Sequence, residues 1–186
     1  MSKKSSKIPA YIHPPKAYYI IYFSFLGRIT MKKYRSYIIS VLIALAVGGL
    51  SALLTQGSNN IYESFNQPPL SPPPQLFPVV WSILFTLMGI SSAGVWESLK
   101  DRGHTWSPAL TVYAVNLGMN FLWSIIFFNL QAFFFAFVWL ILLIGVIIKM
   151  ISDFRKEKQW TGNLQIPYLL WCVFALYLNF GIYVLN

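Results

Sequence analysis

The sequence contains five long runs of apolar residues, separated by shorter polar stretches. The runs lie at about 37–54, 77–96, 108–128, 132–151 and 166–185, and Lys149 near the end of the fourth is their only charged residue. A helix needs roughly 20 apolar residues to cross a hydrocarbon core of about 30 Å. Backbone polar groups in lipid must be paired inside the protein, so continuous runs predict helices rather than a β-barrel of alternating segments. The pattern therefore predicts an all-α membrane protein, a five-transmembrane-helix bundle.

Composition supports this class. Of the 186 residues, 56% are hydrophobic, 18% are aromatic and only 10% are charged, whereas a soluble domain has about 25% charged residues. A net charge of +9 would suggest a nucleic-acid partner in a soluble protein. In a membrane protein, the orientation of the helices explains the same excess of Lys and Arg. The predicted partner is therefore the lipid bilayer, and no nucleic acid is expected.

The distribution of the cations predicts the orientation. All fourteen Lys and Arg residues lie before the first run, in the second connection, or at the end of the fourth run and in the connection that follows it. The first connection, the third connection and the C-terminus carry none. Cytoplasmic loops are enriched in Lys and Arg, so the N-terminus is expected in the cytoplasm and the C-terminus outside. Binding of anionic lipid headgroups is an alternative explanation of the basic segments.

The first thirty residues are unusual. Ala17–Leu26 is apolar but too short to span a membrane. Met31-Lys32-Lys33, directly before the first run, resembles a bacterial translation start. We therefore expect residues 1–30 to be a basic extension that is dispensable for folding, and residues 31–186 to form the five-helix membrane domain.

The first run carries a small residue at every fourth position, namely Ser40, Ala44, Gly48 and Ala52. These positions share one helix face and allow a second helix to approach closely. Two partners are possible for this face: another helix of the same bundle, or the same helix in a homodimer.

The third run carries two amides, Asn116 and Asn120, with Trp123 and Ser124 continuing the same face. Amides that face lipid without partners would cost several kcal/mol, so this face is expected to point inward. The amides either bond neighbouring helices and hold the bundle together or line a cavity.

Aromatic side chains mark the second and fifth runs. Trp81 and Phe85 share one face of the second run. In the fifth run Trp171 is followed one turn later by Ala175, so a large side chain lies next to a small one that leaves space. These aromatics either fill the core or surround a ligand. Such residues suit a flat, largely apolar ligand with a few polar edges, held by stacking and amide hydrogen bonds.

Other chemistry is missing from the sequence. It contains no Gly-rich phosphate loop and no metal motif, and His13 and His104 lie in different polar segments. Apart from Lys149 near the end of the fourth, the apolar runs contain no charged residue, so ion-coupled transport has little to work with. We therefore predict no catalytic residues, no metal site and no required cofactor.

Three ordered blocks carry a family resemblance. The first runs from Tyr62 through Pro68-Pro69-x-x-Pro72-Pro73 and Phe77 to Val80-Trp81 and Met88-Gly89. The second is Asn120-x-x-Trp123-Ser124-x-x-Phe127-Phe128, and the third is Pro167-Tyr168-x-x-Trp171-x-x-Phe174-Ala175-x-x-Leu178-Asn179. From about Lys32 to Asn186 the chain resembles the tryptophan-rich sensory protein/translocator protein (TspO/MBR) family, whose animal members are called peripheral-type benzodiazepine receptors.

The resemblance implies a five-helix bundle, often a homodimer, that binds porphyrins and synthetic aromatic ligands in a pocket closed by the first loop. The ligand-binding residues that it implies are Tyr62, Pro72, Trp81, Phe85, Asn116, Asn120, Trp123, Trp171 and Ala175. The chain departs from the family pattern at several places. Leu70 and Gln75 lie in the region where Trp residues are frequent, Asn116 stands where a Gln is frequent, and Phe180 and Val184 stand in place of the animal C-terminal cholesterol motif.

The function that this resemblance implies is that of a receptor-like membrane protein with a sensory or regulatory role. Its ligand would be a protoporphyrin-like tetrapyrrole or a similar small hydrophobic aromatic molecule. One alternative is transport of porphyrins or other hydrophobic metabolites, and another is light-dependent porphyrin breakdown, which would make the protein an enzyme. The Lys- and Ile-rich composition favours a bacterial plasma membrane over the mitochondrial outer membrane.

Overall fold

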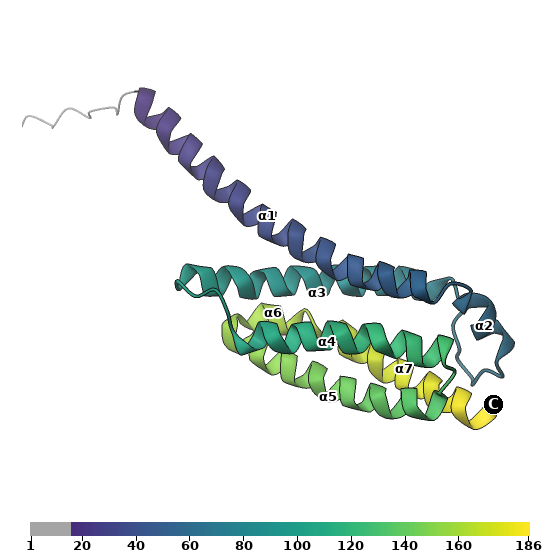
Figure 1. Ribbon diagram of the computed structural model, residues 1–186. Coiled ribbons are helices and arrows are strands. Elements are labelled where there is room, and N and C mark those ends of the chain that lie inside the picture. The colour runs from purple at the N-terminus through teal and green to yellow at the C-terminus, as the bar shows by residue number, and fades with distance from the viewer. Residues whose placement is uncertain (1–15) are drawn as a thin grey trace, which may run out of the picture. The chain divides into compact units, whose positions relative to one another are not determined.

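The computed structural model describes the backbone of residues 16–186, and the side chains from Tyr34 onward except Ser58 and Asn59. All regular structure in this part of the chain is helical (Figure 1). The elements are α1 (Lys16–Leu54), α2 (Ser58–Ser64), α3 (Leu76–Asp101), α4 (Pro108–Ser124), the π-helix η1 (Ile125–Asn129), α5 (Phe133–Glu157), α6 (Gln159–Asn163) and α7 (Ile166–Leu185). The chain divides into two units at residue 34, and the second, Arg35–Asn186, contains the bundle.

Five helices of the described part are long and apolar enough to cross a membrane. They cover Tyr34–Leu54, Leu76–Asp101, Pro108–Asn129, Phe133–Glu157 and Gln159–Leu185. The predicted five-helix membrane fold is therefore confirmed. The orientation of the termini stays a prediction. The predicted division at residue 30 also stays a prediction, because residues 1–30 lie outside the part of the chain whose side chains are described.

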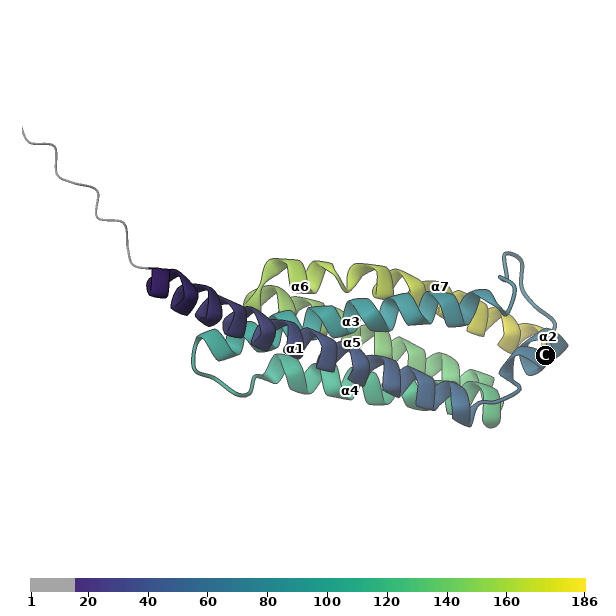
Figure 2. The same cartoon turned by 90° about the horizontal axis from the view of Figure 1, so that it is seen from above.

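The long helices of the second unit lie side by side, as two views at right angles agree (Figures 1 and 2). Residues 35–54 of α1 run along α3, where the backbone of Val41 lies so close to Gly89 that an added Cβ would be 2.5 Å from the Val41 Cα. A Cβ on Gly48 would similarly meet the Phe85 ring at 2.4 Å. Gly48 belongs to the small-residue face of α1, and Ala44 on that face is fully buried. Part of this face therefore packs inside the bundle, which is the first of the two partners that the sequence allowed.

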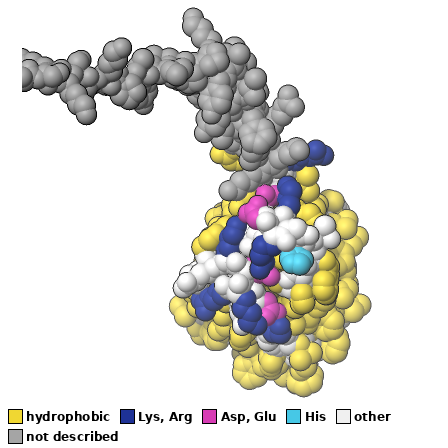
Figure 3. Space-filling model, turned by 90° about the vertical axis from the view of Figure 1, so that its left-hand side faces the viewer, with side chains coloured by type: hydrophobic (Ala, Val, Ile, Leu, Met, Phe, Trp, Pro, Cys, Tyr) yellow, Lys and Arg dark blue, Asp and Glu magenta, His cyan; other side chains and the backbone are white. Residues whose placement is uncertain are grey.

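The two ends of the bundle differ. α2, the connection at 65–75 and the C-terminus lie at one end, which we call the loop end (Figure 1). The connection at 102–107 and α6 lie at the other, where Lys and Arg side chains gather among Asp and Glu (Figure 3); we call this the basic end. Here Arg102 pairs with Glu157, and the Asp153 carboxylate accepts from Lys149 and Lys156.

Side chains fill the bundle toward the basic end. Five residues of α5, namely Leu140, Leu143, Ile147, Met150 and Phe154, are at most 2% exposed. The short α6 packs onto α3, where the Ser91 hydroxyl donates to the Thr161 carbonyl at 2.6 Å. α5 and α6 are therefore densely packed into the bundle toward the basic end.

Candidate functional site

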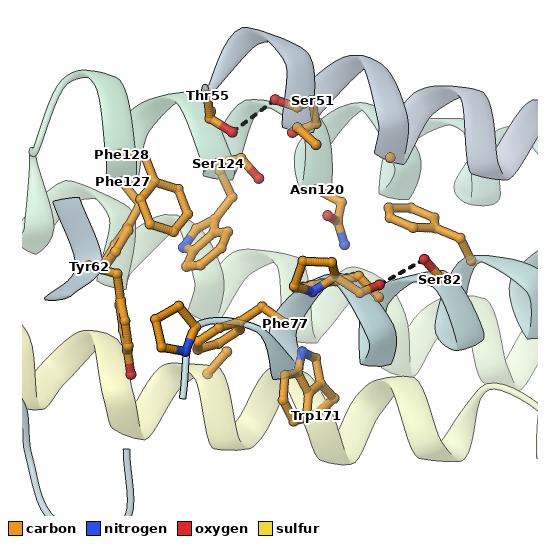
Figure 4. Close-up of a pocket in the computed structure, with 18 of the residues that line it drawn as sticks. Ser51, Thr55, Tyr62, Phe77, Ser82, Asn120, Ser124, Phe127, Phe128 and Trp171 are labelled. Carbon is orange, nitrogen blue, oxygen red and sulfur yellow. Dashed lines mark hydrogen bonds between the residues drawn. The ribbon is translucent and has the colours of Figure 1, made fainter. Parts of the chain in front are cut away.

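A cavity of about 280 Å³ lies in the half of the bundle nearest the loop end (Figure 4). Its walls come from α1, α2, α3, α4 with η1, and α7, together with Pro74 from the connection before α3. Most of the wall is apolar, and aromatic rings dominate it. The aromatic residues in the wall are Tyr62, Phe77, Trp81, Phe85, Trp123, Phe127, Phe128 and Trp171.

The short helix α2 brings Tyr62 to the cavity. It begins after Gly57, whose φ of 84° suits glycine and turns the chain back after α1. Tyr62 is 4% exposed, and its ring meets Phe77 edge-on with centroids 5.1 Å apart. Burial raises the pKa of the Tyr62 phenol above its ordinary value, and the nearby Ser71 hydroxyl partly offsets this. The phenol therefore stays protonated near neutral pH, when it can donate a hydrogen bond.

The π-helix η1 sets the loop-end wall. A π-turn adds one residue to the helical repeat, and such turns are frequent at functional sites. With η1 in place, Trp123, Ser124, Phe127 and Phe128 all line the cavity. The Trp123 and Phe127 rings stack with centroids 5.2 Å apart and planes 22° apart, which gives this wall a flat aromatic surface.

Two further indoles enter from α3 and α7. Trp81 lies beside Phe85 with ring centroids 5.6 Å apart, and Trp171 meets Phe77 edge-on at 6.0 Å. Ala175, one turn after Trp171, is 8% exposed and also lines the cavity. Its small side chain leaves room beside the Trp171 ring, as expected from the spacing of the large Trp171 and the small Ala175.

Several buried polar atoms in this wall make no hydrogen bond within the described residues. They are Ser51 Oγ, Tyr62 Oη, Trp123 Nε1, Trp171 Nε1 and Asn179 Oδ1. Leaving a buried polar group unpaired costs about 1–3 kcal/mol. The two indole N–H groups can only donate. A molecule with hydrogen-bond acceptors in the cavity would satisfy them.

Asn120 reaches the cavity from α4 (Figure 4). Its Nδ2 donates to the Tyr168 hydroxyl at 2.9 Å, and both side chains are buried. This bond fixes the rotation of the amide and thereby the direction of its oxygen. Asn120 thus both ties α4 to α7 and presents a polar edge to the cavity.

The cavity opens sideways. Four of its lining residues are exposed, Gly49 and Ala52 on α1 and Pro78 and Ser82 on α3. Because both helices belong to the five predicted spans, the opening between them faces the lipid of the bilayer.

The proline-rich connection closes the loop end. Pro68 packs on Gly181 of α7, where an added Cβ would lie 2.5 Å from the proline ring. The Tyr177 hydroxyl donates to the Pro69 carbonyl at 2.8 Å. The Asn66 N–H donates to Asn186 Oδ1 at 2.9 Å, and Asn186 Nδ2 donates back to the Asn66 carbonyl at 3.0 Å. These contacts hold the connection against the end of α7.

Seven of the nine predicted ligand-binding residues line this one cavity, and two do not. The seven are Tyr62, Trp81, Phe85, Asn120, Trp123, Trp171 and Ala175. Their role in binding a ligand stays a prediction, since no ligand tests it.

Asn116 and Pro72 do not line this cavity, and their role in binding a ligand stays a prediction. Asn116 is fully buried one turn from Asn120 and is not part of the cavity wall. The proline that lines the cavity is Pro74, not Pro72. In a stiff proline-rich segment with about three residues per turn, side chains two positions apart point in different directions.

The predicted set also missed lining residues. Ser51 and Thr55 lie near the end of α1, and Phe127 and Phe128 lie in η1. A signal for Phe127 and Phe128 was present, because both belong to the motif that begins at Asn120. Ser51 and Thr55 carry no motif, and only the position of α1 beside the cavity reveals them.

Comparison with known proteins identifies the group to which this architecture belongs. Residues 40–185 match the model of the TspO/MBR family. The chain belongs to this family. The predicted family membership is thereby confirmed, and the match extends from residue 40 within the first membrane helix to the end of the fifth.

Curated TspO/MBR relatives come from archaea, bacteria and animals. Tryptophan-rich protein TspO of Archaeoglobus fulgidus is 36% identical over 151 residues, which cover 79% of this chain and 94% of the relative. Tryptophan-rich protein TspO of Chlorobaculum tepidum is 33% identical over 145 residues, 77% of this chain and 91% of that protein. Translocator protein of Ovis aries is 31% identical over 119 residues, which cover 64% of this chain and 70% of that protein. The chain is thus an integral membrane protein of a sensory and translocator family.

Proposed function

We propose that the aromatic cavity binds a flat, hydrophobic ligand of the tetrapyrrole class, and that ligand occupancy gives the protein a sensory role. One observation supports this most strongly: the indoles of Trp81, Trp123 and Trp171, from three different helices, surround a single cavity. Ordinary core packing would leave no space between them.

The aromatic wall suits a planar ring system. Aromatic rings pair in offset-stacked or edge-to-face arrangements, and each such pair adds about 0.5–1.5 kcal/mol beyond the burial of its surface. The stacked Trp123 and Phe127 rings offer one flat surface, and the Trp171 indole offers another on α7. A conjugated macrocycle would contact both, whereas a flexible aliphatic chain would gain only burial.

The polar atoms of the wall suit the edge of such a ring. Among the described residues, the N–H groups of Trp123 and Trp171 and the Tyr62 hydroxyl are donors without acceptors. Tetrapyrroles carry carboxylates on short side chains, and a carboxylate accepts several hydrogen bonds. Pairing would remove the cost of the buried donors and orient the macrocycle.

The size of the cavity constrains how the ligand sits. A four-ring macrocycle occupies more space than the enclosed 280 Å³. The side between α1 and α3 is open, so one edge of the ring would extend through it toward the bilayer. This arrangement explains how a large hydrophobic ligand enters without crossing water.

Titration in lipid nanodiscs tests the proposal. We expect saturable quenching of tryptophan fluorescence by protoporphyrin IX at one equivalent, weaker binding of a linear tetrapyrrole, which is less planar, and none by the single-ring porphobilinogen. Empty nanodiscs correct for partitioning into lipid. Equal affinity for all three compounds, or quenching that never saturates, would contradict the assignment of a macrocycle site.

The lateral opening also favours a second candidate function, the movement of hydrophobic metabolites between the bilayer and the water at the loop end. Proteoliposomes loaded with a porphyrin-binding protein distinguish the two. Transport predicts faster accumulation of porphyrin than in protein-free vesicles, whereas a receptor predicts the same rate in both.

A further inference from the structure

A second hollow lies in the bundle near the basic end, apart from the aromatic cavity. It has a volume of about 350 Å³, and it is lined by Ser36, Ile39, Ser40, Ile43, Ser92, Trp96, Leu110 and Tyr113. These residues come from α1, α3 and α4. None of them lines the aromatic cavity. We call this hollow the basic-end groove.

The groove has apolar sides and a polar floor. Ile39 and Ile43 are 44% and 53% exposed and form the α1 side. Ser92 and Tyr113 lie at the bottom, 5% and 8% exposed. Such a combination suits a molecule with an aliphatic tail and a few polar atoms, rather than a flat aromatic ring.

An unpaired phenol points to a ligand in the groove. Tyr113 Oη is buried and makes no hydrogen bond within the described residues. The Ser92 hydroxyl donates to the Gly89 carbonyl at 3.0 Å and is not in hydrogen-bond geometry with Tyr113 Oη. The phenol proton of Tyr113 thus has no acceptor among the described residues, and an ester carbonyl is an acceptor that the membrane itself supplies.

The depth of Tyr113 matches that of lipid esters. It lies five residues after the start of α4 at Pro108, which is about 7 Å along a helix axis. The interfacial layer on each side of a bilayer is roughly 5–7 Å thick. Trp96 lies five residues before the end of α3 and is 36% exposed, as expected for an interfacial indole.

Two cations flank the groove on its basic side. Arg35 is exposed and lies one turn before Ile39, on the same face of α1. Lys100 lies one turn after Trp96 on α3, with its side chain 51% exposed. The Lys100 amine is also 3.7 Å from the Glu97 carboxylate, so of these two described cations Arg35 attracts an anion more strongly.

We propose that the basic-end groove binds an anionic glycerophospholipid. One acyl chain would lie between α1 and α4 along Ile39, Ile43 and Leu110. An ester carbonyl would accept from Tyr113, and the phosphate would lie near Arg35 and Lys100. This lipid is a resident ligand of the leaflet at the basic end, and it contacts both α1 and α4.

Native mass spectrometry of the full chain in dodecyl maltoside tests the proposal with palmitoyl-oleoyl phosphatidylglycerol and palmitoyl-oleoyl phosphatidylcholine as probes. We expect one phosphatidylglycerol to bind at least tenfold more tightly than any phosphatidylcholine. Leu110→Trp fills the groove and should abolish this tight binding. The matched control, Val115→Trp on the 49% exposed face of α4, should leave it unchanged.

Two gentler variants test the polar contacts and remain informative if Leu110→Trp fails to fold. Tyr113→Phe should weaken phosphatidylglycerol binding about fivefold, the effect of one hydrogen bond, and should not change the affinity for the ether-linked analogue. Arg35→Gln should remove most of the preference for phosphatidylglycerol, whereas Lys158→Gln at the same end should not. Equal retention of both lipids by the wild type, or equal loss in Val115→Trp and Leu110→Trp, would overturn the proposal.

Discussion

The side chains around the aromatic cavity supply three kinds of contact. Indole and phenyl rings give flat apolar surfaces, Asn120 and Tyr62 give polar edges, and Ala175 leaves the space that the other two need. The unpaired N–H groups of Trp123 and Trp171 belong to the same rings that stack. A single indole can therefore contribute both dispersion and a hydrogen bond to one ligand.

Trp171 is the first residue whose replacement tests these contacts. Trp171→Phe keeps an aromatic ring but removes the N–H group and part of the surface. We expect protoporphyrin IX affinity to fall about five- to tenfold, since each such contact contributes about 1 kcal/mol. Equilibrium titration in detergent gives the affinity. Trp106→Phe, at a position 65% exposed near the basic end, is the control and should bind as the wild type does.

The two amides of α4 provide a matched pair. Asn120 lines the cavity and Asn116, one turn away, does not. Asn120→Ala should therefore weaken tetrapyrrole binding severalfold, and Asn116→Ala should leave it unchanged. The same titration measures both. A larger loss for Asn116→Ala than for Asn120→Ala would show that the site extends deeper than the cavity.

Residue type and helical spacing predicted much of this site. Trp81, Trp123 and Trp171 stand out because polar groups within membrane helices are expected to point into the bundle. The three family motifs contain the same residues. Spacing identifies the helix face but not the depth at which neighbouring helices separate, so it could not show that Asn116 lies outside the cavity wall. The sequence also does not show which proline ring of the irregular segment faces the cavity, and in the structure this is Pro74 rather than Pro72.

At the scale of elements, the long helices follow directly from the apolar runs. The start of α4 was also predictable, because Ser107 caps it by accepting from the Ala109 N–H at 3.2 Å and Pro108 takes the first helical position. The short helices α2 and α6 and the π-helix η1 were not predicted. Each has at most seven residues, so its stability comes from tertiary contacts rather than from local preference.

The close contact between α1 and α3 predicts a contrast between two glycines. A Cβ on Gly89 would lie 2.5 Å from the backbone of Val41, whereas nothing lies within 4 Å of a Cβ on Gly118 in α4. Gly89→Ala should therefore destabilise the bundle by about 1–3 kcal/mol. Gly118→Ala should be neutral or slightly stabilising, because alanine favours helix. Thermal unfolding in detergent compares them, and equal midpoints would contradict the contact.

At the scale of the whole molecule, the two ends of the bundle differ in charge. Described Lys and Arg side chains gather at the basic end, and the proline-rich connection covers the loop end. The excess of cations predicts that the basic end faces the cytoplasm. The cavity would then lie in the outer half of the membrane.

Thiol labelling in intact cells tests this orientation. Cys172, the native thiol, is fully buried and should stay silent. Leu70→Cys places a thiol at a loop-end position that is 83% exposed, and a membrane-impermeant maleimide should label it from outside. His104→Cys at the basic end should react only after the cells are broken. The reverse pattern would invert the topology.

The most direct test of the aromatic cavity as a ligand site uses two substitutions on one helix. Ala175→Leu places a larger side chain in the space beside Trp171, whereas Val173→Leu makes a smaller change at a position 49% exposed. The measurement is the binding isotherm of protoporphyrin IX for both variants and the wild type. The account predicts saturable one-to-one binding that Ala175→Leu abolishes and Val173→Leu retains. Unaltered binding by Ala175→Leu, in a protein that still folds, would contradict it.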